Sequence, residues 1–468
     1  MSFLNHISKY KKKIALTDGI TNLSYEKLID RSKKFTNKIE KRSLIFLMTN
    51  NDLQTICFYL GLILKKSTTA LLNGNIKDDN LKKLLLKYKP KYIIAKKKTF
   101  ISKYELIDKK NNYSIFIRKE KISYKISKNL ALLLTTSGTT GNPKFVRLSY
   151  ENFSDNIKNI IKSIKIKKND SVITTLPVSY TFGLSIINTF LFSGSKIFIN
   201  EKSIMDKKFW VEYKKFKPTH FYGVPFTFEI LSKLKFKNLY TSSLKTIAVA
   251  GGKLSQEILK KLINFSFKKK IKFYNMYGQT EASPRMAVLD DKYKLKKINS
   301  IGKPINGGKF ILMSERKKKI FTPYTEGSLK YSGKNVFMGY SKSYRDLNKE
   351  NQNNMMLDTG DLAFFDLNNF FYIVGRKKRF IKLFGIRINL DDIEEIISKI
   401  GFESECEIID NIVKINYNNK KFDIKKIIKI LSNQLSINQN YIKFNYVNSF
   451  LKNKKNSKWI LYEKNLLF

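Results

Sequence analysis

Residues 134–144 read Leu134-Thr-Thr-Ser-Gly-Thr-Thr-Gly-Asn-Pro-Lys144, a loop rich in glycine and hydroxyl groups that ends in a lysine. The loop follows an apolar run, 130–134, which is typical of a buried strand. Gly138 and Gly141 allow backbone conformations closed to other residues, so main-chain N–H groups can surround phosphate oxygens while Lys144 adds positive charge. The spacing of a Walker A loop is absent. The loop therefore predicts a different kind of phosphate site, with a plain Ser/Thr/Gly turn as the alternative.

Apolar runs alternate with amphipathic stretches on both sides of this loop. Strands are predicted at 43–49, 68–72, 92–95, 130–134, 171–176, 196–199, 246–250 and 271–275. Helices are predicted at 52–65, 78–88, 184–192 and 255–265. Such alternation indicates parallel sheets covered by helices, which is an α/β fold. From about residue 309, shorter strands and turns predict a small barrel-like β region.

The last part of the chain has a pattern of its own. After Arg376 come a strand, a helix at 390–399, a strand at 412–417, a helix at 424–435 and a strand at 441–446. This order predicts a small α+β unit. We therefore expect a large N-terminal domain, residues 1–376, and a small mobile C-terminal domain, residues 377–468, which fits a chain of 468 residues.

The charge of the chain is strongly positive, with 90 Lys and Arg against 38 Asp and Glu, a net of +52. A strong positive field attracts polyanions such as nucleic acid or a membrane surface. However, lysine is spread from Lys9 to Lys464, without a basic tail. We interpret the charge as biased composition and expect no specific nucleic-acid partner.

Few side chains suit a metal site or a disulfide framework. The two cysteines, Cys57 and Cys406, lie far apart, and the two histidines are His6 and His220. His220 begins an apolar run and is expected to be a packed structural residue. The charge-free stretch 171–195 is long enough for a membrane span, but proline, glycine and polar residues interrupt it. Because no signal-peptide pattern is visible, a cytoplasmic protein without a membrane span is expected.

Three further motifs carry chemistry. Tyr274-Asn-Met-Tyr-Gly-Gln-Thr-Glu281 follows a predicted strand and offers a ring for base stacking and hard oxygen atoms for a phosphate-bound Mg²⁺. Leu357-Asp-Thr-Gly-Asp-Leu362 is either a tight turn or a source of carboxylates that accept hydrogen bonds from ribose. A basic cluster spans Gly375 to Ile388 at the expected change of domain.

The order of these four motifs resembles that of the AMP-binding, acyl-adenylate-forming enzymes, which include acyl-CoA synthetases, luciferases and adenylation domains. Their surroundings are also similar, including Ala248-Val-Ala-Gly-Gly-Lys253, Ile301-Gly-Lys-Pro304 and Tyr331 to Tyr340. The resemblance extends from Ala15 to the C-terminus. It implies a large body and a small lid domain that clasp one nucleotide.

The resemblance implies a set of nucleotide-binding residues. The loop up to Lys144 would hold the β- and γ-phosphates of ATP, with Tyr277 against the adenine ring and Asn275 at its edge. Thr280 would contact the α-phosphate, and Glu281 would hold Mg²⁺. Asp361 and Arg376 would bind the ribose hydroxyls. The full expected set is Thr136, Ser137, Gly138, Thr139, Thr140, Gly141, Gly251, Gly252, Lys253, Asn275, Met276, Tyr277, Gly278, Gln279, Asp361 and Arg376.

The resemblance also implies the catalytic parts. The expected catalytic side chains are Lys458, Thr280, Glu281 and Lys144, with Lys455 as the alternative to Lys458. Lys378 falls at the family's hinge. The acid site would be gated by Tyr180, Phe182 and Gly183, although the family often has histidine where this chain has Tyr180. Ser457 also replaces the usual glycine before the catalytic lysine.

The function implied is ATP-dependent activation of a small-molecule carboxylic acid through an acyl-adenylate, with Mg²⁺. Thioester formation with coenzyme A (CoA) or a phosphopantetheinyl acyl carrier protein would follow, as in a fatty-acid-type or other acyl ligase. An amino-acid-activating enzyme is the first alternative, but the segment 176–182 lacks the acid that usually anchors an α-amino group. A decayed, inactive ligase and a charge-driven nucleic-acid-binding or structural protein are the others.

Overall fold

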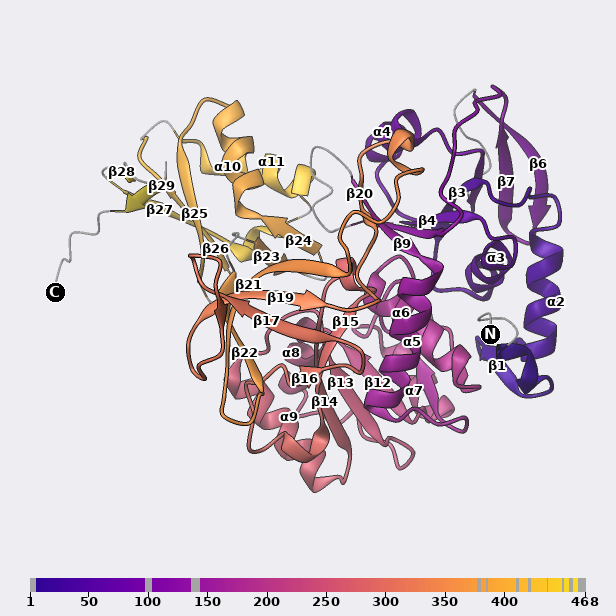
Figure 1. The fold of residues 1–468 in the computed structure, drawn as a ribbon, viewed down its shortest axis with the longest axis horizontal. Coiled ribbons are helices and arrows are strands. Elements are labelled where there is room, and N and C mark those ends of the chain that lie inside the picture. The colour runs from indigo at the N-terminus through magenta and orange to yellow at the C-terminus, as the bar shows by residue number, and fades with distance from the viewer. Residues whose placement is uncertain are drawn as a thin grey trace. The chain divides into compact units, whose positions relative to one another are not determined.

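The computed structural model describes residues 6–96, 103–135, 144–376, 380–383, 386–409, 412–419, 422–435, 437–447, 450–453 and 458–461. These residues form two compact units, the larger ending at Gly375 and the smaller beginning at Arg376 (Figure 1). Lys378, the expected hinge, lies outside the described residues, and its role stays a prediction.

One sheet of the larger unit has eight strands in the order β20-β9-β8-β4-β3-β5-β7-β6. The strands are β3 (Leu44–Thr49), β4 (Thr68–Asn73), β5 (Tyr92–Ala95), β6 (Tyr104–Lys110), β7 (Tyr113–Arg118), β8 (Leu130–Thr135), β9 (Phe145–Ser149) and β20 (Gly339–Ser341). The central pairs β5/β3, β3/β4 and β4/β8 are parallel. Every residue of β3 is buried, as expected for a strand covered on both faces.

The second sheet has nine strands in the order β16-β15-β14-β13-β12-β10-β11-β1-β2. The strands are β1 (Ile14–Thr17), β2 (Asn22–Ser24), β10 (Ser171–Ile173), β11 (Lys196–Phe198), β12 (His220–Gly223), β13 (Thr246–Val249), β14 (Lys272–Gly278), β15 (Arg285–Leu289) and β16 (Lys303–Pro304). The pairs from β10 to β14 are parallel. Their carboxyl ends therefore lie at one edge of the sheet.

Helices of the larger unit pack against these sheets. They are α2 (Tyr25–Phe35), α3 (Leu53–Leu64), α4 (Asp78–Tyr88), α5 (Tyr150–Ile164), α6 (Thr181–Phe192), α7 (Lys207–Phe216), α8 (Pro225–Lys233) and α9 (Gln256–Lys268). The start of α5 is defined by a reciprocal capping box, in which Ser149 and Asn152 bind each other's main-chain N–H groups. Helices α5 and α6 lie side by side (Figure 1).

A third sheet of the larger unit has five strands in the order β18-β17-β19-β21-β22. The strands are β17 (Lys309–Met313), β18 (Lys319–Ile320), β19 (Gly327–Ser332), β21 (Met356–Phe365) and β22 (Phe371–Arg376). Neighbouring strands from β18 to β21 pair antiparallel. This sheet is the small β region expected after residue 309.

The smaller unit has its own core, which includes Ile393, Val413 and Leu431. Its elements are β23 (Phe380–Leu383), β24 (Ile386–Asn389), α10 (Leu390–Lys399), β25 (Ser404–Ile409), β26 (Ile412–Tyr417), α11 (Ile424–Leu435), β27 (Ile442–Tyr446), β28 (Phe450–Asn453) and β29 (Lys458–Leu461). The predicted α/β class and the small α+β unit are confirmed.

Four predicted boundaries in the larger unit were wrong by three residues. Helix α9 ends at Lys268 rather than at residue 265, and strand β14 ends at Gly278 rather than at residue 275. Helix α6 begins at Thr181, three residues before the predicted start, without a side-chain cap on its first turn. Strand β10 ends at Ile173 rather than at residue 176. Just beyond Ile173, the hydroxyl group of Thr174 donates a hydrogen bond to the carbonyl oxygen of Asn200.

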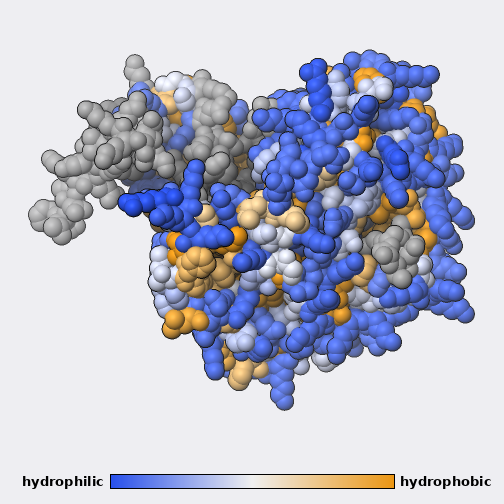
Figure 2. Space-filling view, in the orientation of Figure 1, coloured by the Kyte–Doolittle hydropathy of each residue, from blue (hydrophilic) through white to orange (hydrophobic). Residues whose placement is uncertain are grey.

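The distribution of hydrophilic side chains on the surface agrees with the expectation that charge is spread along the whole chain. Hydrophilic side chains are spread over the visible face of the larger unit (Figure 2). Cys57 and Cys406 are buried and form no disulfide, and His220 is 3% exposed within β12. Among the helices that the structure describes, none has both the length and the apolar character that a bilayer span requires.

Candidate functional site

The candidate site begins where parallel strands of the nine-stranded sheet end. Gly223 of β12, Val249 of β13 and Asn275 of β14 lie in register across neighbouring strands. Ligands of open α/β sheets bind at the carboxyl ends of the strands. Gly251, which follows β13, and Gly278, the last residue of β14, are therefore placed at the edge where a ligand is expected.

The structure explains why glycine occupies two of these positions. Gly251 has φ +94°, and a Cβ atom there would lie 2.9 Å from the hydroxyl oxygen of Tyr180. At Gly278, a Cβ atom would lie 1.7 Å from the carbonyl oxygen of Pro284. Gly278 is required for packing, whereas Gly251 brings its backbone close to the expected acid site.

The residues expected around the nucleoside come together. The carboxylate of Asp361 accepts hydrogen bonds from the hydroxyl group of Tyr277 and, over 3.1 Å, from Nε2 of Gln279. Asp361 is 1% exposed and stands on β21, in a different sheet from Tyr277. Asn275 donates from Nδ2 to the carbonyl oxygen of Ser300 over 3.0 Å, which orients its amide. Neighbouring Met276 is buried.

Residues suited to phosphate and magnesium form a second group. The hydroxyl oxygens of Thr280 and Thr181 are 2.9 Å apart and hydrogen-bonded. Glu281 is 7% exposed, and its Oε1 accepts a hydrogen bond from the hydroxyl group of Tyr340 over 2.8 Å. Nζ of Lys144 lies 3.8 Å from the centroid of the Tyr340 ring. The predicted residues Lys144 and Glu281 are thus linked through Tyr340.

The chemistry of this group suits a magnesium ion bound mainly by a nucleotide. In the described part of the chain, no three His, Cys, Asp or Glu side chains are grouped so that they could hold a metal ion. Mg²⁺ is commonly held by one or two carboxylates together with substrate phosphates and water. Glu281 fits that role as a single protein ligand whose orientation is fixed by Tyr340.

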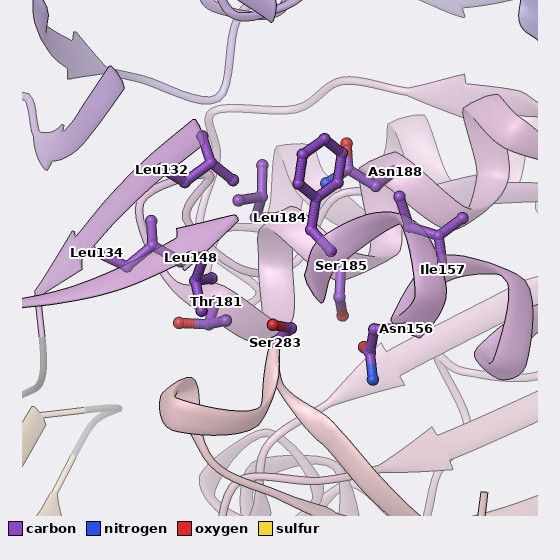
Figure 3. Close-up of a pocket in the computed structure, with 11 residues that line it drawn as sticks. Leu132, Leu134, Leu148, Asn156, Ile157, Thr181, Leu184, Ser185, Asn188 and Ser283 are labelled. Carbon is purple, nitrogen blue, oxygen red and sulfur yellow. The ribbon is translucent and has the colours of Figure 1, made fainter. Parts of the chain in front are cut away.

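A small pocket is lined in part by Thr181 and has about 280 Å³ of empty space, which includes open solvent (Figure 3). Leu132 and Leu134 of β8 and Leu184 of α6 line its apolar part, while Thr181 and Ser283 contribute polar groups. Tyr180, Phe182 and Gly251 do not line it. The pocket is therefore lined by neighbours of the gate residues in α6, such as Thr181 and Leu184, rather than by the gate residues themselves.

The gate residues lie at the start of α6. Gly183 is buried, and a Cβ atom there would lie 2.3 Å from the carbonyl oxygen of Pro177, so only glycine fits. The Phe182 ring contacts Tyr180 and Tyr222 at centroid distances of 6.4 and 6.3 Å. Of these three side chains, that of Tyr180 lies beside Gly251.

Several predicted residues have no described side chain. The phosphate-loop residues Thr136, Ser137, Gly138, Thr139, Thr140 and Gly141, together with Lys378 and Lys455, lie outside the described residues. The backbones of Arg376 and Lys458 belong to β22 and β29. Their roles stay predictions, as do those of Gly252 and Lys253, both of which are exposed.

Sequence reasoning missed three residues of this region: Tyr340, Tyr222 and Arg285. Tyr340 closes a segment that resembles the family, but its contact with Glu281 spans 59 residues of sequence. Arg285 could have been noticed from the sequence, because it is a charged residue directly before the apolar run Met286-Ala-Val-Leu289. Tyr222 carried none beyond its place in an apolar strand.

Comparisons with known proteins agree with this geometry. The chain is 26% identical over 420 residues to 2-succinylbenzoate–CoA ligase from Oceanobacillus iheyensis. The aligned region covers 84% of this chain and 82% of that protein. It is 28% identical over 279 residues to the ligase of that name from Bacillus cereus, and spans 56% of that relative's length.

Solved structures share the fold. An o-succinylbenzoate–CoA synthetase from Bacillus subtilis aligns with a TM-score of 0.80 at 18% identity, covering 98% of this chain and 97% of that one. A long-chain-fatty-acid–CoA ligase from Archaeoglobus fulgidus aligns with a TM-score of 0.67 at 16% identity, covering 95% and 97%. Residues 3–341 match the AMP-binding enzyme family, and because this is well over half of the chain, the protein belongs to that family.

Proposed function

We propose that this enzyme activates a carboxylic acid with ATP, forms an acyl-adenylate, and transfers the acyl group to the thiol of CoA. The observation that supports this most directly is the clustering of Tyr277, Gln279 and Asp361 beside Thr280 and Glu281. The cluster offers a ring for a base, a buried carboxylate for a ribose, and oxygen atoms for phosphate-bound magnesium. Membership of the AMP-binding family gives the same reaction class.

The nucleoside would be recognised by acceptors that the fold has already oriented. Because Nδ2 of Asn275 donates to Ser300, its Oδ1 faces the other way and can accept from an exocyclic amine of adenine. The carboxylate of Asp361 would accept hydrogen bonds from ribose hydroxyls. The Tyr277 ring would stack against the base, its tilt fixed by the hydrogen bond to Asp361.

The first chemical step joins two anions, because the substrate carboxylate attacks the α-phosphorus of ATP and pyrophosphate leaves. The ammonium groups of Lys144 and Lys458 would offset the repulsion where charge develops, and Thr280 would donate to the α-phosphate. When bound, Mg²⁺ supplies further positive charge beside Glu281. The side chains of this protein thus serve mainly to position the two substrates and to offset their negative charges.

In the second step the sulfur of CoA attacks the acyl carbon, and AMP leaves. CoA is the acceptor named in the relatives' activities, and 2-succinylbenzoate is the acid named there. That acid is the first to test here, and the fatty-acid substrate and the carrier-protein acceptor stay predictions. Rotation of the smaller unit about Lys378 between the two steps is part of the same proposal.

The test is a pyrophosphate-release screen with magnesium and ATP over 2-succinylbenzoate, aromatic acids, fatty acids and amino acids. We expect release with one acid class, and a CoA thioester of that acid by mass spectrometry when CoA is added. Release with amino acids alone would favour the amino-acid-activating alternative. Absence of release with every acid, in folded protein, would indicate the decayed ligase.

A further inference from the structure

Arg285 is a buried cation at the start of β15. Its side chain is 2% exposed, and its guanidinium carbon lies 4.7 Å from the centroid of the Phe182 ring. Its Nε has no hydrogen-bond partner among the described residues. Within the described part of the chain, the titratable groups that act on its charge are the hydroxyls of Tyr222 and Tyr180, not carboxylates. Arg285 therefore has no anion of its own.

The charge of Arg285 persists despite burial. Burial lowers the pKa of its guanidinium to about 10, so the group is still protonated at neutral pH. Removing a permanent charge from water is costly unless it is paired, and a single contact with an aromatic face offsets only part of that cost.

Arg147 shows how this chain treats a buried arginine that serves the fold. Arg147 is fully buried, and its Nη2 donates to the carbonyl oxygen of Met338 over 3.0 Å and to Oε1 of Gln352 over 2.8 Å. Its Nη1 donates to the carbonyl oxygen of Lys349. Nε lacks a hydrogen-bond partner in both arginines. What distinguishes the two positions is that no such acceptors of Nη1 and Nη2 surround Arg285 among the described residues.

Two hydroxyl groups accompany Arg285. The hydroxyl of Tyr222 is buried and has no hydrogen-bond partner among the residues that the structure describes. The hydroxyl of Tyr180 lies 2.9 Å from the place of a Cβ atom at Gly251, beside the expected acid site. Burial raises the pKa of both tyrosines, so each hydroxyl keeps its proton and can donate. Three groups of donors thus lie around Phe182, and no acceptor for them is found in the described part of the chain.

We propose that Arg285, together with Tyr222 and Tyr180, binds an anionic group of the acid substrate other than the carboxylate that is activated. The substrate class is then a dicarboxylic acid or another acid with a second anion. This inference rests on the proposed function. The activated carboxylate loses its charge when the acyl-adenylate forms and would leave Arg285 unpaired. A second anion keeps its charge through both steps and stays paired with Arg285.

A test without substrate compares Arg285→Met with the matched variant Arg147→Met by thermal melting. A buried cation whose partner is a ligand destabilises the protein when the ligand is absent. Arg285→Met is therefore expected to melt at or above the wild-type temperature. Arg147→Met is expected to melt several degrees below the wild type, because the buried acceptors that bind Arg147 lose their hydrogen-bond donor. A loss for Arg285→Met as large as that for Arg147→Met would show a structural arginine and overturn the proposal.

A second test measures pyrophosphate release with matched acids: adipate against hexanoate, and homophthalate against phenylacetate. The wild type should prefer the diacid by about 100-fold in kcat/KM, since unpaired buried donors reject an analogue that lacks the anion. Arg285→Gln should lose that preference through KM for the acid, with AMP affinity unchanged. If the wild type uses monoacids as well as diacids, or if Arg285→Gln keeps the preference for the diacid, this inference is overturned and the proposed function still stands. No release with any acid would remove the proposed function as well.

Discussion

The hydroxyl group of Tyr340 donates a hydrogen bond to Oε1 of Glu281 over 2.8 Å, although 59 residues separate the two in the chain. The same tyrosine ring lies under Nζ of Lys144. One side chain thus connects the lysine that follows the phosphate loop with the carboxylate expected to hold magnesium.

We expect Tyr340→Phe to weaken the use of magnesium while keeping the ring beneath Lys144. A hydrogen bond to a charged group contributes about 1.5–3 kcal/mol, which corresponds to roughly 10- to 100-fold. The magnesium concentration for half-maximal pyrophosphate release should rise within that range, with little change in melting temperature. An unaltered magnesium requirement would show that Tyr340 does not orient Glu281.

Asp361→Asn should weaken nucleotide binding more than Tyr277→Phe does. The asparagine keeps the shape of Asp361 but removes the charge that would accept from ribose hydroxyls, so KM for ATP should rise by about 10- to 100-fold. Tyr277→Phe keeps the ring and loses only the hydrogen bond to Asp361. Steady-state kinetics at saturating acid compare the two, and an equal or reversed order would argue against a ribose at Asp361.

Gly278→Ala is expected to destabilise the larger unit, because its Cβ atom would fall 1.7 Å from the carbonyl oxygen of Pro284. Severe packing conflicts cost about 4 kcal/mol or more. Gly375→Ala is the control, since nothing lies within 4 Å of a Cβ atom there. Urea unfolding should separate the two variants clearly, and similar midpoints would mean that the strand bends freely at Gly278.

His220 should make stability depend on pH below neutrality. Burial lowers its pKa from 6.5 to about 4, and the opposing Asp170 carboxylate lies 3.9 Å from Nε2. Between pH 6.5 and 4 the unfolded chain binds a proton that the folded chain does not. The free energy of unfolding is therefore highest above pH 6.5 and falls by up to about 1.4 kcal/mol per pH unit below it.

The control for this pH dependence is His220→Gln, which removes the titrating ring. Urea unfolding at a series of pH values should give a shallower decline for the variant between pH 6.5 and 4. Parallel curves for the two proteins would assign the decline to other groups.

Lys458→Ala should lower pyrophosphate release by about 100- to 1,000-fold, as expected when one group that stabilises the transition state is lost. ATP affinity should stay near that of the wild type, because the lysine acts on charge that develops during attack. Lys455→Ala provides the comparison. A larger effect at Lys455 would move the catalytic assignment to that residue.

Local patterns predicted local structure well. The helices α4, α10 and α11 have the predicted bounds, since each carries a regular apolar face and ends at a clear change of pattern. Helix α6 was misplaced because its whole length is buried and its start has no capping side chain. When a helix has no amphipathic pattern, its first and last residues are hard to locate from the sequence.

The motifs predicted which residues belong to the site, but not how they contact one another. Asp361 was expected at the ribose from its motif, yet its hydrogen bonds to Tyr277 and Gln279 join residues more than 80 positions apart. The burial of Arg285 and Tyr222 without hydrogen-bond partners among the described residues was missed, although Arg285 stands out in the sequence as a charge at the start of an apolar run. An unpaired buried donor is visible only once the surrounding side chains are placed.

The central claim is that one nucleotide binds at Tyr277 and Asp361 in the larger unit. Isothermal titration calorimetry of the purified, magnesium-supplied protein with AMP and with ATP tests it most directly. The account predicts saturable binding of one nucleotide per chain, lost in Asp361→Ala while the variant remains folded. Folded wild-type protein that gives no binding heat with either nucleotide at several temperatures would contradict it.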